Sequence, residues 1–253
     1  MKKIAPLVIL SLLTATPVFA GNDADTKVVA FSASVRVDVD ATGKPVKVEA
    51  PADLPDVIRS YIEKRVATWQ YQPAKQDGQP VAATTYVGIN ACAVPAEGGY
   101  RLGLDFNGNG PRNAGDQRLK PPLYPNEPER LGTQAEFVLI LDLAMDGTAR
   151  IADFEKIEFD GRKGRAAFRP VLERWVKTIH FDPEIVAGRP VAGQLRMPVS
   201  FVLRDGSRNL QALREEFQAG LKTSRECQVA AGADDMKPIA MESVVKVTPV
   251  PAG

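Results

Sequence analysis

The sequence predicts an α+β fold of two small β-β-α-β modules in tandem, each an antiparallel sheet with one helix across it. Two observations predict this fold. Two stretches of the chain repeat each other. Upstream of each stretch, the apolar residues first alternate, as in strands, and then recur at helical spacing. The expected parts are a signal peptide in 1–20, a first module in 21–93, a connector loop in 94–118, a second module in 119–205, and a C-terminal helix and tail in 206–253.

The repeated stretches are 69–81 and 179–191. Each has an aromatic residue, a proline two residues later, and then Gly-x-Pro-Val. The matched residues are Tyr71, Pro73, Gly78, Pro80 and Val81 in the first stretch, and Phe181, Pro183, Gly188, Pro190 and Val191 in the second. Their constant offset indicates that a small module has been duplicated.

Each module opens with alternating apolar residues around a glycine turn. Alternation runs from Val35 to Val39 before Thr42-Gly43, and from Phe137 to Leu143 before Asp146-Gly147. Glycine accepts the positive φ that tight hairpin turns need, so each run predicts a two-stranded hairpin. A third strand is expected after each Pro-Val, over 84–89 and 194–203.

Apolar residues at i, i+3, i+4 and i+7 predict one helix in each module. The stripes run from Leu54 to Trp69 and from Phe168 to Ile179. Asp53 stands where an N-cap is expected, because its carboxylate can accept from the free N–H groups of the first turn. A further stripe predicts an amphipathic helix over 208–222, and the last stretch, 243–250, is compatible with a strand.

With these elements in order, the chain resembles the C-terminal domain of TonB and its relatives over 28–92 and 119–204. The glycine hairpin, the striped helix, the aromatic-x-Pro step, the Gly-x-Pro-Val turn and the final strand carry the resemblance. The lead-in Pro121 to Pro125, followed by Arg130-Leu131-Gly132, is also similar to the family's opening. The resemblance implies a protein-binding domain that accepts an extended partner segment against a sheet edge. No family contact residue finds a one-to-one match here, so none is carried over.

The position of proline indicates which of the two sheet edges is better able to accept a partner strand. Pro198 lies within the final strand of the second module, where it removes a backbone donor. The corresponding run of the first module has no proline, so the predicted binding edge is Thr84, Thr85, Tyr86, Val87, Gly88 and Ile89. The alternative is that the chain's own connector or C-terminal strand already covers this edge, because exposed edges are usually covered.

Export is predicted by Lys2 and Lys3, an apolar run from Ile4 to Phe19, and small residues before Gly21. We expect cleavage before Gly21, a periplasmic protein and no integral membrane segment afterwards. An uncleaved anchor, as in a TonB-like energy transducer, is the alternative. Without the two lysines the formal charge falls from +1 to −1, so nucleic acid is not an expected partner. The expected partner is a protein or peptide of the cell envelope.

The two cysteines, Cys92 and Cys227, predict one disulfide, because an isolated pair in an exported protein is usually bridged. Such a bridge closes a long loop and contributes about 4–5 kcal/mol in the chain-entropy model. A redox or nucleophilic thiol is the alternative.

Part of the connector matches a calcium-loop spacing. Asp105, Asn107, Asn109 and Asp116 take ligand positions of the EF-hand pattern, with Gly110 at its glycine. Ordinary turns are the alternative, since Asn and Gly also favour turns. No other cofactor is expected.

No catalytic motif stands out. The single histidine, His180, lies in the repeated stretch and has no second histidine as a partner. We therefore predict no catalytic residue and no enzyme. The alternative is an envelope enzyme or inhibitor whose site forms only in the fold and unites His180 with distant carboxylates.

Overall fold

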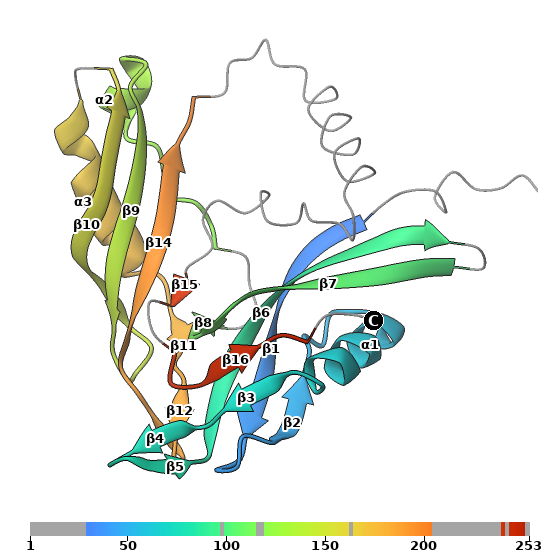
Figure 1. The fold of residues 1–253 in the computed structure, drawn as a ribbon. Coiled ribbons are helices and arrows are strands. Elements are labelled where there is room, and N and C mark those ends of the chain that lie inside the picture. Colours follow the sequence, from blue (N-terminus) through green and yellow to red (C-terminus); the bar gives the residue numbers. More distant parts are fainter. Residues whose placement is uncertain are drawn as a thin grey trace, which may run out of the picture.

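The structure, a computed structural model, describes residues 29–96, 99–114, 119–161, 164–203, 239–240 and 243–250. It consists mostly of strands with few helices, which confirms the α+β class (Figure 1). The signal-peptide run, the stripe over 208–222 and Cys227 lie outside the described residues.

The first module has the expected order of hairpin, helix and returning strand. Its antiparallel sheet places one strand, β1, between β2 and β6. Its elements are β1 (Val29–Val39), β2 (Pro45–Glu49), α1 (Asp56–Val66), β3 (Gln70–Gln72), β4 (Ala74–Gln76), β5 (Gln79–Val81) and β6 (Ala83–Ala96). Inward residues of β1 pack with Ile62 and Val66 of α1 and with Trp69 in one core.

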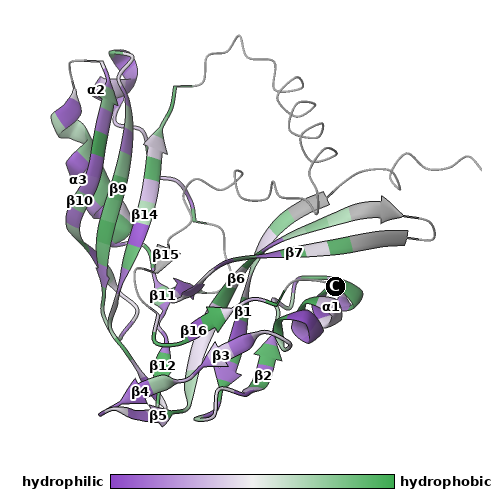
Figure 2. Cartoon of the chain, in the orientation of Figure 1, coloured by the Kyte–Doolittle hydropathy of each residue, from purple (hydrophilic) through white to green (hydrophobic). Residues whose placement is uncertain are grey.

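The second module repeats this order. Its sheet runs β10-β9-β14, and α3 lies along one face of it (Figure 1). The elements are α2 (Asn126–Arg130), β9 (Gln134–Leu143), β10 (Ala149–Asp160), η3 (Arg165–Ala167), α3 (Phe168–Val176), β11 (Phe181–Asp182), β12 (Ile185–Val186), β13 (Arg189–Pro190) and β14 (Gly193–Phe201). Figure 2 shows hydrophobic and hydrophilic residues alternating along β9.

Buried aromatic rings form the centre of the second core. Phe168 of α3 meets Phe201 of β14 with ring centroids 4.8 Å apart, and both contact Phe137 of β9. The lead-in before α2 closes the end of this core, since the Tyr124 hydroxyl donates to the Thr133 carbonyl at 2.7 Å. The predicted stripe therefore becomes the face that α3 turns to the sheet.

Two local expectations are wrong. Asp53 is not the N-cap of the first helix: residues 51–54 form a turn, closed by Leu54 N–H to the Pro51 carbonyl at 3.3 Å, and α1 begins after an extended Pro55. The connector is also less loop-like than expected, because it contains β7 (Gly99–Gly110) and β8 (Arg112–Asn113). Apolar residues alternate at Tyr100, Leu102, Leu104 and Phe106, and β7 continues from them through the Asn-Gly run, with a register shift in β6 opposite it.

The tail returns to both modules. Its strands are β15 (Ile239–Ala240), which pairs with β14, and β16 (Lys246–Thr248), which pairs with β3. The expected last strand is thus confirmed in β16. Val245, just before β16, is fully buried in the core of the first module.

The hairpin glycines meet the same neighbour in both modules. Gly43 and Gly147 have φ of +86° and +84°, and a Cβ added to either would lie 2.3 or 2.2 Å from the carbonyl oxygen of Tyr71 or Phe181. These aromatics are the matched residues of the two repeated stretches. The glycine turn and the aromatic-x-Pro step are therefore joined by a close backbone approach that no side chain allows.

We predict that Gly147→Ala lowers the free energy of unfolding by about 2–4 kcal/mol, because it adds a backbone clash to the strain of a positive φ. Gly188→Ala is the matched control, since Gly188 has φ +78° and open space around it. Its cost should be about 1–2 kcal/mol. Urea unfolding followed by circular dichroism measures both, and equal losses would contradict the role given to the close approach.

Candidate functional site at the sheet edges

The predicted binding edge is occupied by the chain itself. Thr84–Ile89 lies in β6, which pairs with β1 along one side. On the other side β12 pairs at Ala83 and Thr84, and β7 pairs from Tyr86 onward. The expectation of an acceptor edge at this run is therefore corrected: an incoming strand would have to displace the protein's own strands.

The strand that reaches across belongs to the second module. Its β12–β13 hairpin turns at Ala187 and Gly188, both with positive φ, and joins the sheet of the first module (Figure 1). Ala187 N–H donates to the Ala82 carbonyl at 2.9 Å. The corresponding hairpin of the first module, β4–β5, pairs with itself alone among the described strands.

Glu184, immediately before β12, is a buried carboxylate in the seam between the modules. It is 2% exposed and accepts three hydrogen bonds: from the Thr85 hydroxyl at 2.6 Å, the Ser243 hydroxyl at 2.6 Å and the Val244 N–H at 3.0 Å. Burial raises its pKa, and these donors oppose that shift. One side chain thus links the second module, β6 and the tail.

Asn109 of β7 completes this polar cluster. Its Nδ2 lies 2.7 Å from Ser243 Oγ, 2.8 Å from the Val245 carbonyl and 3.1 Å from Thr85 Oγ1. We call Thr85, Asn109, Glu184 and Ser243 the junction cluster. It holds the tail at the point where Val245 enters the first core.

The connector makes a second link between the modules beside the junction cluster. β8 pairs with β11, and Arg112 Nε donates to Asp182 Oδ2 at 2.9 Å. The Arg112 guanidinium also lies 4.7 Å from the centre of the Tyr86 ring, a cation–π contact. Burial raises the pKa of Tyr86 most, and the negative charge of Asp182 raises this pKa further.

The edge of the second module differs from that of the first. β14 pairs with β9 from Gly193 to Phe201. On its other side, the described part of the chain supplies partners at Leu195 and Arg196 alone, both from β15. The outer edge from Met197 to Phe201 is therefore unpaired among the described residues, and Pro198 lies within it opposite Val138 with no shift of register.

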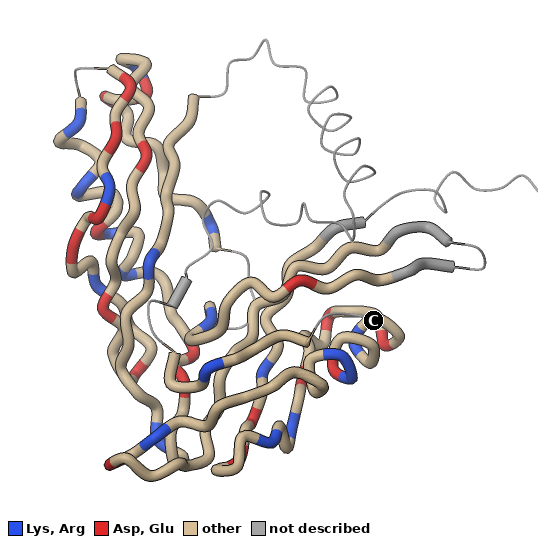
Figure 3. Tube along the Cα trace, viewed as in Figure 1, with Lys and Arg blue, Asp and Glu red and all other residues tan. Residues whose placement is uncertain are grey.

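Charge is sparse along this edge. Arg196 is the one charged residue of β14, visible as a single blue segment in Figure 3, and it pairs with Glu155 of β10 at 2.5 Å. Leu195, Met197, Val199 and Phe201 point into the core, so the outer face of β14 presents Gln194, Arg196, Pro198 and Ser200.

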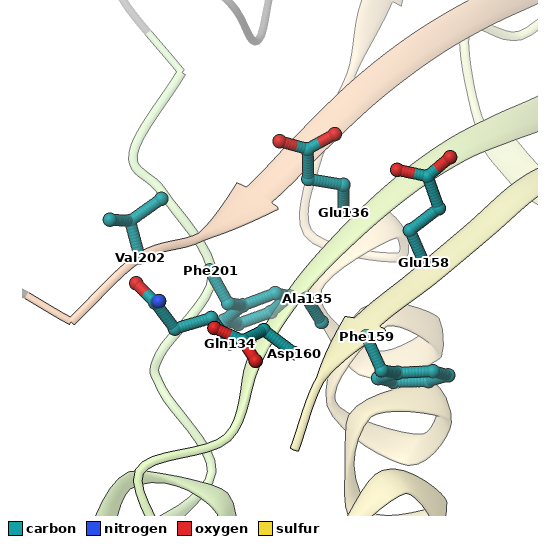
Figure 4. A pocket seen from close by; sticks show the side chains of 8 residues that line it. All are labelled: Gln134, Ala135, Glu136, Glu158, Phe159, Asp160, Phe201 and Val202. Carbon is teal, nitrogen blue, oxygen red and sulfur yellow. The ribbon is translucent and has the colours of Figure 1, made fainter.

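A hollow of about 300 Å³ lies where β14 ends (Figure 4). Glu136 and Glu158, directly opposite each other on β9 and β10, point the same way, and Lys156 lies 3.3 and 3.1 Å from them. The remaining lining residues are Gln134, Ala135, Phe159, Asp160, Phe201 and Val202. The hollow thus continues the open edge with an acidic rim.

Most of the calcium-loop candidates lie in a strand. Asp105, Asn107 and Asn109 belong to the extended strand β7, while Asp116 lies outside the described residues, so the calcium loop stays a prediction. Asn107 donates to Asn90 Oδ1 at 3.3 Å, and Asn109 belongs to the junction cluster. No group of three or more His, Cys, Asp or Glu that could hold a metal occurs within the described ranges.

The remaining sequence candidates are Cys92 and His180. Cys92 is 1% exposed in β6, and its expected partner Cys227 lies outside the described residues, so the disulfide stays a prediction. His180 is exposed in an isolated bridge to Thr148.

No helix in the described part of the chain is long and apolar enough to cross a bilayer.

Sequence reasoning missed Glu184. A signal was present: the residues matched to Ala74, Lys75 and Gln76 of the first hairpin are Glu184, Ile185 and Val186. An apolar pair where the other copy is polar indicates a hairpin packed against something else.

Comparison with known proteins finds TonB proteins. Two curated proteins named Protein TonB, from Xanthomonas campestris pv. campestris strains B100 and ATCC 33913, are each 32% identical to this chain over 87 residues. The match spans 34% of this chain and 37% of each relative. No family model matches the chain, and no solved structure matches it. The comparisons thus indicate a TonB-like domain in part of the chain.

We predict that Glu184→Ala lowers the free energy of unfolding by about 2–4 kcal/mol, because it leaves buried donors of Thr85, Ser243 and Val244 without their acceptor. Glu173→Ala is the control, since Glu173 is exposed on α3 and its pair with Arg169 is 3.8 Å long. Its effect should stay within about 0.5 kcal/mol. Equal effects in denaturant unfolding would contradict the junction cluster.

Proposed function

We propose that this protein is a periplasmic, non-catalytic binding protein that accepts an extended segment of a cell-envelope protein by β-strand addition at the outer edge of β14. The open run Met197–Phe201 carries the proposal, because an unpaired edge offers main-chain donors and acceptors to another strand. The similarity to TonB proteins supports a protein partner.

The contrast between the modules supports this choice of edge. In both, the last strand of the module pairs on one side with the first strand of the hairpin, so its other side is the edge in question. In the first module the chain fills that edge with β7 and β12, so the same type of edge is able to accept strands. In the second module it is left open beyond Arg196 among the described residues.

The edge also sets what the partner should look like. β15 runs antiparallel to β14, so an antiparallel partner strand fits the same geometry. Pro198 offers a carbonyl without an N–H, which limits the ladder to the positions on either side of it. A partner that continues past Phe201 reaches the acidic rim of the hollow, where a lysine or arginine is favoured over a carboxylate.

Photocrosslinking tests the edge. We expect a benzophenone amino acid placed at Ser200 of β14 to form adducts with an envelope protein in cells that produce this variant. The crosslinked peptide of the partner should be an extended segment. Ile157 on β10 is the control: it lies at the opposite edge of the same sheet and is 47% exposed. Adducts at Ile157 alone, or equally at both positions, would contradict strand addition at β14.

Export and the disulfide belong to the same proposal. The intact mass of the protein recovered from the periplasm should begin at Gly21, and Cys92 and Cys227 should be alkylated only after reduction. A mass that retains residues 1–20 would contradict cleavage and favour a membrane anchor. Alkylation without reduction would contradict the bridge.

A further inference from the structure

The tail covers the start of the edge proposed to bind a partner. Ile239 and Ala240 of β15 pair with Arg196 and Leu195 of β14, next to the open run. β15 also lies beside β7, the connector strand that pairs with β6 of the first module. In Figure 1 it is the short red arrow next to β14.

The residues that follow β15 are held firmly. Ser243 and Val244 bond to Glu184, Val245 is buried in the first core, and β16 pairs with β3. The Arg65 guanidinium also donates to the Val250 carbonyl. The tail therefore keeps β15 close to β14 at a high effective concentration even when β15 is detached.

The pairing of β15 itself is short, and the sequence limits its growth. Pro238 precedes Ile239, and Pro198 follows Met197 in β14. Each proline lacks the N–H that a longer antiparallel ladder would need. A two-residue ladder is weak enough for a longer partner strand to displace.

We infer that β15 is a built-in competitor for the β14 edge: a firmly anchored tail holds a weak strand over the start of the site, and a partner must displace it. This inference rests on the proposed function, because it names what regulates the same edge. Displacing β15 removes the tail's pairing with β14, while Ser243 and Val244 stay bonded to Glu184 of the second module.

The full-length double variant Ile239→Pro/Ala240→Pro removes both main-chain donors of β15 and leaves residues 243–250 intact. The probe is a fluorescein-labelled peptide with the sequence of residues 236–242. We expect this variant to bind the peptide about tenfold more tightly than the native chain, the equivalent of one or two net hydrogen bonds. Ile239→Ala, which keeps both donors, should bind as the native chain does.

Amide hydrogen exchange at Leu195 and Arg196, of which the one whose N–H faces β15 should respond, separates the possible outcomes. Faster exchange in the proline variant with tighter peptide binding supports the competitor. Unchanged exchange and binding would overturn it and leave the proposed function standing. Faster exchange without peptide binding would overturn both, because the uncovered edge would then accept no strand. Tight binding by Ile239→Ala would also overturn the competitor, since the backbone pairing would not be its cause.

Discussion

The buried carboxylate of Glu184 is the constraint on which the arrangement of the two modules depends. A carboxylate removed from water costs several kcal/mol unless hydrogen bonds compensate it. Its three donors come from β6 of the first module and from the tail. The second module can therefore dock on β6 at low cost only when the tail is in place, and this makes three segments far apart in sequence mutually dependent.

That docking gives two similar modules different roles. In the first, β7 and β12 close the edge of β6, and the module becomes a base for the second module and the tail. In the second, α3 covers one face of the sheet, and no strand of the described ranges pairs with the outer edge of β14 beyond β15. Natural proteins usually cover such edges to avoid unwanted pairing, so an edge left open beside a short strand fits a binding role.

The sequence predicted the features that local physics decides. The alternating runs became β1 and β9, and Gly43 and Gly147 took the positive φ that hairpin turns require. Of the contacts between distant segments, it offered only the alternative that the connector covers β6, which β7 does; nothing near Thr84 in sequence shows that Ile185 pairs with it. Asparagines spaced like calcium ligands became rungs of β7, because pairing with β6 outweighed their preference for turns. Asp53 failed as an N-cap because Pro55 holds an extended backbone after the turn.

Residue-level amide hydrogen exchange on the full-length protein tests this account most directly. Because other strands pair with β6 along both of its edges, we expect the amides from Thr84 to Ile89 to exchange slowly, whichever edge their N–H faces. The open edge of β14 predicts fast exchange at those residues from Met197 to Phe201 whose N–H faces away from β9, except Pro198, which has no N–H. Fast exchange at alternate residues of β6 together with uniform protection of β14 would contradict it, because the free edge would then belong to the first module.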